Sequence, residues 1–293
     1  MKKYLANKHW KKATIISSTL IVFAIALFWV SPFVFTLINS FKPLRESIDS
    51  SNFFKLPINS TQNNYSKSFS DINYFHASLL TLGITIASNL SIIIFGSLAA
   101  WQLARTKKWY AKVIFYTFLV ALIIPFQSIM FPLINDVAVK FNLRNVMGLI
   151  VLYTGFGISL SVFMIHGFIA TIPLSLEEVA KVEGLGRIKT FFKVVIPLLR
   201  QILTTILILN TMWIWNDFLL PNLIKNAGSY NSFTLIVNLY SNIGVHALNP
   251  GQIMAGVTSI IIPVVVFFIV MQKNIVSGIT NGGYKINYGN QIK

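Results

Sequence analysis

Six apolar runs of 18 to 28 residues, separated by polar connections, dominate this 293-residue sequence. A helix needs about 20 apolar residues to cross about 30 Å of hydrocarbon at about 1.5 Å per residue. Only 11% of the residues are charged, against about 25% in soluble domains. The runs extend over 14–38, 77–104, 111–133, 148–170, 195–219 and 254–271. The sequence therefore predicts an all-α polytopic membrane protein with six transmembrane helices.

The first run follows a tail with five lysines, which is also how a secretory signal peptide begins. The run is longer than the apolar core of about 7 to 15 residues that signal peptides carry. It also lacks a cleavage site of small residues, since Ser31-Pro32-Phe33 within it is followed by further apolar residues. We therefore expect an uncleaved helix that stays in the membrane.

The 24 Lys and Arg residues are distributed unevenly along the chain and exceed the 8 acidic residues, for a net charge of +16. Seventeen of them lie in the two terminal tails and in the second-to-third and fourth-to-fifth connections. Because cytoplasmic loops are enriched in Lys and Arg, both termini are expected in the cytoplasm. The excess charge then indicates topology and contact with anionic membrane lipids, and does not support nucleic acid binding.

This topology divides the chain into a series of segments. The expected divisions are a cytoplasmic tail over 1–13, a first transmembrane helix over 14–38, an extracellular loop over 39–76, a transmembrane core over 77–272 and a cytoplasmic tail over 273–293. The core contains a cytoplasmic loop over 172–193 and an extracellular loop over 220–253.

Motifs of enzymes and cofactor-binding proteins are missing from the sequence. It has no phosphate-binding loop, no cysteine and no clustered histidines, so no catalytic residue, metal site or cofactor is predicted. An ion-driven carrier would need ionisable groups in mid-membrane. Among the acidic residues and histidines, only His166 and Asp217 lie in the runs, near their ends. A secondary solute transporter is nevertheless the alternative to the function inferred below.

The fourth-to-fifth connection contains a short helical segment. Ser175 and Glu178 have the spacing of a capping box that begins a helix, and Gly184 is placed to end it in a left-handed turn. Leu176, Val179, Ala180 and Glu183 share one face. Spacing alone fits either a knob for a protein partner or a loop resting on lipid headgroups.

A second amphipathic pattern follows this helix. Ile188, Phe191, Phe192 and Val195 repeat at helical spacing opposite basic residues, which predicts a helix lying in the headgroup plane. Pro197 then opens the fifth transmembrane helix, where its missing N–H costs nothing.

Several stretches resemble a known family. Glu177-Glu178-Val179-Ala180, Glu183-Gly184 and Ile196-Pro197-Leu198-Leu199 resemble the EAA loop in membrane subunits of ATP-binding-cassette (ABC) importers. The stretches at 39–43, 215–221 and 272–283 resemble carbohydrate permeases of the maltose-transporter G-subunit type. Val179 stands where the family usually has Ala, and Glu183 where it usually has Asp. The resemblance covers nearly the whole chain.

The resemblance implies a type I ABC importer (MetI-like) permease fold and a binding-protein-dependent sugar importer in a bacterial cell membrane. The chain would bind neither ATP nor a cofactor, and would not be an enzyme. Its implied partners are a second permease subunit, two cytoplasmic ATPase subunits and an extracellular sugar-binding lipoprotein. The residues implied to couple to the ATPase are Glu177, Glu178, Val179, Ala180, Glu183, Gly184 and Pro197.

Two further regions are candidates for contact with sugar or its binding protein. Trp213, Asn216 and Asp217 near the end of the fifth run offer rings and polar groups of the kind that sugars contact. Because about 20 residues separate Asp217 from Pro197, the same residues also fit an aromatic belt at the membrane surface. The resemblance implies that residues 222–252 reach toward the binding protein.

Overall fold

The computed structural model describes residues 2–228, 233–245 and 249–288. Regular structure in these ranges is helical throughout, as expected. The chain divides into two compact units. The small unit comprises Met1–Ile72 and Leu239–Ile262, and the large unit comprises Asn73–Asn238 and Pro263–Lys293.

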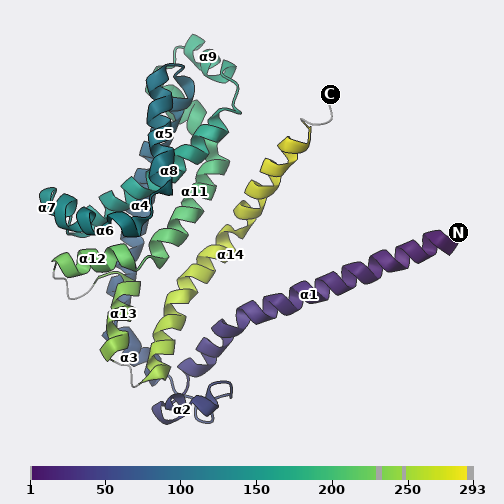
Figure 1. The fold of residues 1–293 in the computed structure, drawn as a ribbon, viewed down its shortest axis with the longest axis vertical. Coiled ribbons are helices and arrows are strands. Elements are labelled where there is room, and N and C mark those ends of the chain that lie inside the picture. Colours follow the sequence, from purple (N-terminus) through teal and green to yellow (C-terminus); the bar gives the residue numbers. More distant parts are fainter. Residues whose placement is uncertain (1, 229–232, 246–248, 289–293) are drawn as a thin grey trace. The chain divides into compact units, whose positions relative to one another are not determined.

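Four helices form the body of the large unit: α4 (Tyr74–Arg105), α5 (Trp109–Ile123), α8 (Val146–Ile169) and α11 (Ile196–Asn216). They lie side by side, with α4 packed along α8 (Figure 1). Glycine permits this close approach, because a Cβ atom at Gly157 would lie 2.5 Å from Ile92 Cδ1 of α4.

Two clusters of buried side chains make up the core of the large unit. One includes Leu149, Tyr153, Ile214 and Phe233. The other includes Trp101, Ile165, Phe191 and Leu199. The second cluster lies below the short helix α9 (Ser175–Val182), which Figure 1 shows at one end of the bundle. It therefore provides the base on which α9 rests.

The third apolar run differs from its expected form. Instead of one helix over 111–133, α5 ends at Ile123 and α6 (Phe126–Pro132) begins after a bend of 95°. Pro125 has no N–H to continue α5, and it holds Ile124 in an extended conformation. The π-helical turn η2 (Leu133–Val137) and α7 (Ala138–Lys140) follow α6. The described residues thus contain five helices long and apolar enough to cross a membrane, or six if the bent pair is one span.

The expected helix in the headgroup plane before Pro197 is also wrong. α10 (Arg187–Thr190), the π-helical turn η3 (Phe191–Val195) and α11 form one helix of 30 residues. Phe191 and Val195 are buried in the large unit rather than turned toward lipid. The π-helical turn precedes Pro197, whose ring disturbs a regular α-helical bond pattern. The fifth helix therefore begins at Arg187, ten residues before Pro197.

The small unit contains α1 (Lys2–Ser40), α2 (Leu44–Ile48), η1 (Ser50–Asn52) and α3 (Asn63–Asp71). Parts of α13 (Leu235–Val245) and α14 (Pro250–Tyr288) complete it. Lys42, fully buried, holds the connection after α1. Its ammonium donates to Asn39 Oδ1 at 2.8 Å and to the carbonyls of Asn52 at 2.6 Å and Phe53 at 3.3 Å.

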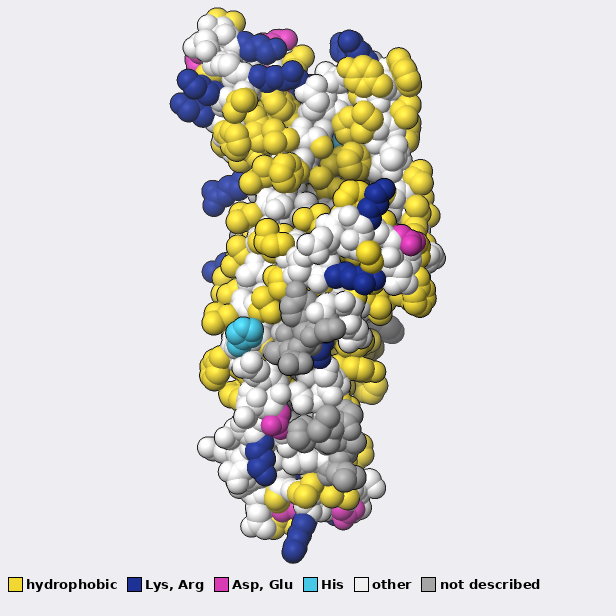
Figure 2. Space-filling view, turned by 90° about the vertical axis from the view of Figure 1, so that its left-hand side faces the viewer, with side chains coloured by type: hydrophobic (Ala, Val, Ile, Leu, Met, Phe, Trp, Pro, Cys, Tyr) yellow, Lys and Arg dark blue, Asp and Glu magenta, His cyan; other side chains and the backbone are white. Residues whose placement is uncertain are grey.

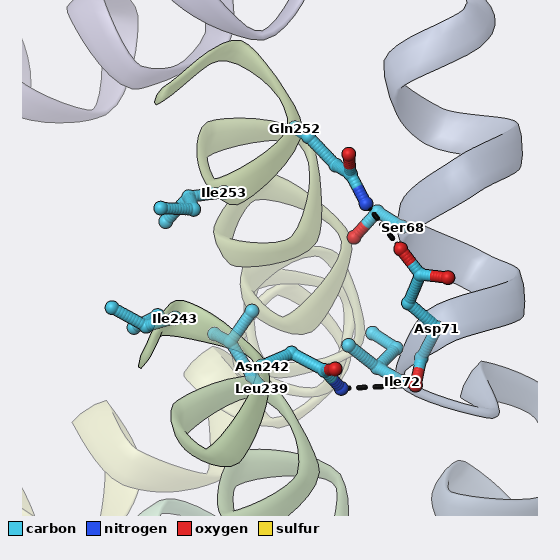
Figure 3. A pocket seen from close by; sticks show the side chains of 8 residues that line it. All are labelled: Ser68, Asp71, Ile72, Leu239, Asn242, Ile243, Gln252 and Ile253. Atoms are coloured by element: carbon cyan, nitrogen blue, oxygen red, sulfur yellow. Dashed lines mark hydrogen bonds between the residues drawn. The ribbon is translucent and has the colours of Figure 1, made fainter. Parts of the chain in front are cut away.

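A cavity of about 10 Å³ lies in the small unit between α3, α13 and the start of α14 (Figure 3). Gln252 donates from its side-chain amide to the Asp71 carboxylate, and Asn242 Nδ2 donates to the Asp71 carbonyl at 2.9 Å (Figure 3). Two residues of the segment expected to dock the binding protein are therefore engaged in bonds within this unit.

Candidate functional site

The N-cap residue of α9 is Leu174, whereas the sequence predicts that Ser175 caps the helix. Leu174 occupies the N-cap position and makes no side-chain cap hydrogen bond, while Ser175 is already helical. The expected capping box is therefore wrong. The Leu174 carbonyl instead accepts from the backbone N–H groups of Glu177 at 2.9 Å and Glu178 at 3.1 Å. Both acidic residues lie in the first turn, where negative charge stabilises a helix.

The end of α9 has the predicted geometry. Gly184 has a φ of +79°, a conformation that costs glycine little. The Gly184 N–H donates to the Lys181 carbonyl and the Leu185 N–H donates to the Ala180 carbonyl, both at 3.0 Å. This pair of bonds is a Schellman motif. The predicted left-handed end of the helix at Gly184 is confirmed.

One face of α9 is buried, and Glu177 on that face is bonded to α4. Glu177 is only 5% exposed, and Ala180 beside it is also buried. Glu177 Oε1 accepts from Arg105 Nε at 2.8 Å, and Glu177 Oε2 accepts from the indole N–H of Trp101 at 3.0 Å. Arg105 Nη2 donates at 3.0 Å to the carbonyl of Ile172, in the connection before α9. Both oxygens of this buried carboxylate are thus bonded, and its charge is paired.

Aromatic packing extends this contact to the start of the fifth helix. The rings of Trp101 and Phe191 have centroids 5.3 Å apart. The Arg187 guanidinium lies 5.7 Å from the Trp101 ring and donates to Gln102 Oε1. A cavity of about 240 Å³ opens here. It is lined by Leu98, Trp101, Gln102, Arg187, Ile188 and Phe191.

The opposite face of α9 is exposed and partly apolar. Leu176, Val179 and Val182, spaced three residues apart, are 44%, 56% and 90% exposed. Glu178 and Glu183 are exposed beside them. Figure 2 shows Lys and Arg side chains gathered at the α9 end of the large unit. An exposed apolar stripe rimmed by charged groups is typical of a surface that contacts another protein.

Comparison with known protein families identifies the chain. A family model described as "Binding-protein-dependent transport system inner membrane component" matches residues 92–281. The chain belongs to this family. It is a multi-pass inner membrane protein and a permease subunit of an ABC importer, as expected from the sequence. Such a subunit is not itself catalytic, and the family lacks cofactors.

Curated relatives resemble the permease over most of its length. The probable starch degradation products transport system permease protein AmyC of Thermoanaerobacterium thermosulfurigenes is 37% identical, covering 91% of this chain and 96% of AmyC. The multiple sugar-binding transport system permease protein MsmG of Streptococcus mutans is 32% identical, covering 87% and 91%. The melibiose/raffinose/stachyose import permease protein MelC of Bacillus subtilis is 32% identical, covering 91% and 95%.

A solved structure confirms the fold. A chain of a bacterial ABC transporter involved in the import of the acidic polysaccharide alginate superposes with a TM-score of 0.72 at 19% identity. The match covers 88% of the permease and 95% of that chain. The expected ABC importer permease fold is therefore confirmed.

The residues predicted to couple to the ATPase separate into distinct positions. Glu177 is bonded to α4 and Ala180 is buried, whereas Glu178, Val179 and Glu183 are exposed, and Gly184 forms the turn. Pro197 lies in α11, beyond the π-helical turn, and not on α9. The structure thus leaves only part of the predicted set accessible to a partner.

Two of the three predicted pathway residues lie together. Tyr153 of α8 donates to Asp217 Oδ2 at 2.9 Å, and its ring meets that of Trp213 edge-on, with centroids 5.4 Å apart. Asp217 Oδ1 also accepts from the N–H of Leu219, at the start of α12 (Leu219–Gly228). Asn216 is exposed, and its amide donates to the Met212 carbonyl. Asp217 therefore holds the end of α11 against α8.

The sequence reasoning missed two groups of polar residues. Trp101 and Arg105 were treated as part of an apolar run and as a topology charge, although their spacing of four residues places them on one helix face. Asn89 in mid-helix donates to the Thr85 carbonyl at 2.9 Å and to Thr211 Oγ1 at 3.2 Å, which joins α4 to α11. A buried amide inside an apolar run was the available signal.

Proposed function

We propose that the permease is one of two membrane subunits of an ATP-driven sugar importer, and that the exposed face of α9 docks its ATPase. The observation that carries this proposal is the apolar stripe of Leu176, Val179 and Val182 on a helix whose other face is fixed to the bundle. A surface that receives a partner's movement must be both accessible and firmly attached, and α9 meets both conditions.

A sugar is the substrate class best supported by the relatives. Starch degradation products, multiple sugars and the melibiose series occur in their printed names. All three relatives align over nine-tenths or more of their own length. Di- and oligosaccharides are therefore the first compounds to test.

The proposed orientation places both termini and α9 in the cytoplasm. It is supported by the excess of Lys and Arg in the segments on that side and by their concentration at the α9 end (Figure 2). The proposed partners are a second permease subunit, two cytoplasmic ATPase subunits and an extracellular sugar-binding lipoprotein. Membrane lipids cover the apolar surface of the spans.

In the proposed mechanism, ATP binding closes the ATPase dimer and displaces α9. Because α9 is bonded to α4, this displacement moves the bundle and changes the side of the membrane to which the pathway is open. Sugar delivered by the binding protein then enters the pathway. Trp213 is 40% exposed and offers a ring for sugar stacking. Asp217 bonds Tyr153, whose ring packs edge-on against that of Trp213.

Val179→Arg tests the docking face. We expect the tagged variant to reach the membrane and to retain the second permease, but to lose at least about nine-tenths of the bound ATPase and of ATP-dependent sugar uptake. A buried apolar contact does not accept an unpaired guanidinium. Lys107→Glu, in the exposed connection after α4, is the control and should retain both activities.

Two results would contradict the proposal. If Val179→Arg binds the ATPase and imports sugar as the parent does, α9 is not the docking surface. If the purified permease alone carries solute into vesicles under an ion gradient, the alternative of a secondary transporter is correct.

A further inference from the structure

Neither connection of α9 to its neighbouring long helices is a continuous helix. Before it, the segment from Ala170 to Leu174 contains Pro173 and no continuous helix. After it, Gly184 and Gly186 flank Leu185 in a short turn. Because neither connection carries α9 on as one helix, side-chain contacts contribute to how α9 is held on the bundle.

Glu177 bonds α9 to residues that are far away in the sequence. Its partners Arg105 and Trp101 precede it by 72 and 76 residues and lie on the last turns of α4. Arg105 also bonds the Ile172 carbonyl, so one guanidinium holds both α9 and the connection that enters it. Arg105 therefore joins α4 both to the buried Glu177 carboxylate of α9 and to the backbone of the α8–α9 connection.

We infer that Glu177 is a positioning residue that locks α9 to α4, so that displacement of α9 by the ATPase reaches the bundle. This inference rests on the proposed function of α9. It separates Glu177 from Glu178, although the two adjacent acids were predicted to couple together. Glu178 lies on the exposed face available to a partner, whereas Glu177 acts inside the permease.

The chemistry of the contact suits a lock. A buried ion pair adds little net stability, but removing one partner leaves the other charge without compensation. The ion pair instead fixes an orientation, because one geometry satisfies both carboxylate oxygens, the guanidinium and the indole N–H. Any rotation of α9 relative to α4 would break at least one of these bonds.

The lock continues into the fifth helix through Trp101. The indole that bonds Glu177 also packs on the Phe191 ring, and the guanidinium of Arg187 lies over the indole. Phe191 is fully buried in the π-helical turn η3. A displacement of α9 would thus act on the ends of two long helices together.

Spin labels can measure the lock directly, because the permease has no cysteine of its own. Labels at Lys181→Cys on α9 and Lys107→Cys after α4 report the distance between the two elements in the purified importer. We expect a narrow distance distribution in the parent and in the control Glu178→Gln. In Glu177→Gln, the distribution should widen at least about twofold, because the carboxylate charge that pairs with Arg105 is lost.

The functional readout is the number of sugar molecules imported per ATP hydrolysed in proteoliposomes. We expect Glu177→Gln to retain its ATPase subunits but to lower this ratio at least about tenfold. A folding defect would lower import and hydrolysis together and leave the ratio unchanged. Trp101→Phe keeps the ring on Phe191 and removes only the indole N–H, so it should lower the ratio by a smaller factor of about three.

The outcomes distinguish this inference from the proposed function. If Glu177→Gln keeps a narrow distribution and a normal ratio while Val179→Arg releases the ATPase, the lock is wrong and the docking face stands. If Glu177→Gln itself releases the ATPase, Glu177 is a docking residue and the lock is again wrong. If Val179→Arg has no effect, the docking proposal is wrong, and the lock is wrong with it.

Discussion

Each unit of the permease has a buried charge that holds a connection, but the two charges do so differently. Lys42 in the small unit bonds oxygens that lie 3, 10 and 11 residues away. Glu177 in the large unit bonds side chains that lie 72 and 76 residues away. Lys42 therefore shapes one connection, whereas Glu177 joins elements that are distant in the chain.

The partners of the two charges also differ. Lys42 meets only uncharged oxygens, from one amide side chain and two backbone carbonyls. Glu177 meets a guanidinium that neutralises it. Burial lowers the pKa of Lys42 because its charge loses solvent without gaining a bonded counter-charge. Lys42 thus serves the architecture of one unit, whereas the contacts of Glu177 fit the proposed transmission between elements.

Lys42→Met should have the largest effect on stability. Methionine fills similar space but removes three hydrogen bonds, at about 1 kcal/mol each. Asn39 Oδ1 loses its donor, whereas the carbonyls of Asn52 and Phe53 keep the Lys55 N–H and Asn39 Nδ2. We expect a loss of about 3 kcal/mol, measured by thermal unfolding of the purified importer. Lys55→Met, at an exposed site nearby, should change stability by less than about 0.5 kcal/mol. Equal effects of the two substitutions would show that Lys42 has no architectural role.

Gly251→Ala tests the packing around the Lys42 backbone, against which Gly251 lies. A Cβ atom at Gly251 would lie 2.7 Å from the Lys42 carbonyl and 2.7 Å from Asn64 Nδ2. Asn64 Nδ2 bonds that same carbonyl, so neither atom can move freely. We expect a loss of about 2 kcal/mol in thermal unfolding. Gly155→Ala in α8 is the control, because no neighbour lies within 4 Å of its Cβ position. If Gly251→Ala is as stable as the parent, the packing of Gly251 against Lys42 and Asn64 is looser than these distances imply.

Gly184→Ala examines the end of α9, where the large unit relies on backbone conformation. A φ of +79° disfavours alanine by about 1 kcal/mol, although no neighbour would clash with its Cβ. Because the Glu177 contacts lie elsewhere on α9, we expect a loss of this size with a sugar-to-ATP ratio near the parent value. Gly186→Ala, at a φ of −66°, should be neutral. A collapse of the ratio in Gly184→Ala would transfer the positioning role from Glu177 to the turn.

Much of the fold could be predicted because apolar run length and glycine conformation act locally. The apolar runs predict the membrane-spanning helices, and Gly184 predicts where α9 ends. The bend at Pro125 was missed because the apolar run continues through it to 133, so composition alone reads as one helix. Proline removes one backbone bond, and neighbouring packing decides whether the helix bends or breaks.

The site was less predictable because periodicity assigns residues to a face without showing which face is buried. Ala180 was grouped with the exposed Leu176 and Val179, yet it is buried beside Glu177. The partners of Glu177 lie more than 70 residues away, and spacing within α9 carries no information about them. Only the packing of α9 on α4 distinguishes the internal acid from the exposed one.

The smallest predicted effect is a pH dependence of the stability that Lys42 contributes. Because the folded-state pKa of Lys42 lies below its ordinary value of 10.5, the folded protein releases that proton more easily than the unfolded chain. Stability contributed by Lys42 should therefore rise with pH in the window just below 10.5 and be flat near neutrality. The difference in unfolding free energy between the parent and Lys42→Met, measured at intervals from pH 7 to about 10, checks this. The same difference for Gly155→Ala should stay constant in that range, because that substitution changes no ionisable group. A parallel drift in both would show that alkaline pH acts on the whole permease and not through Lys42.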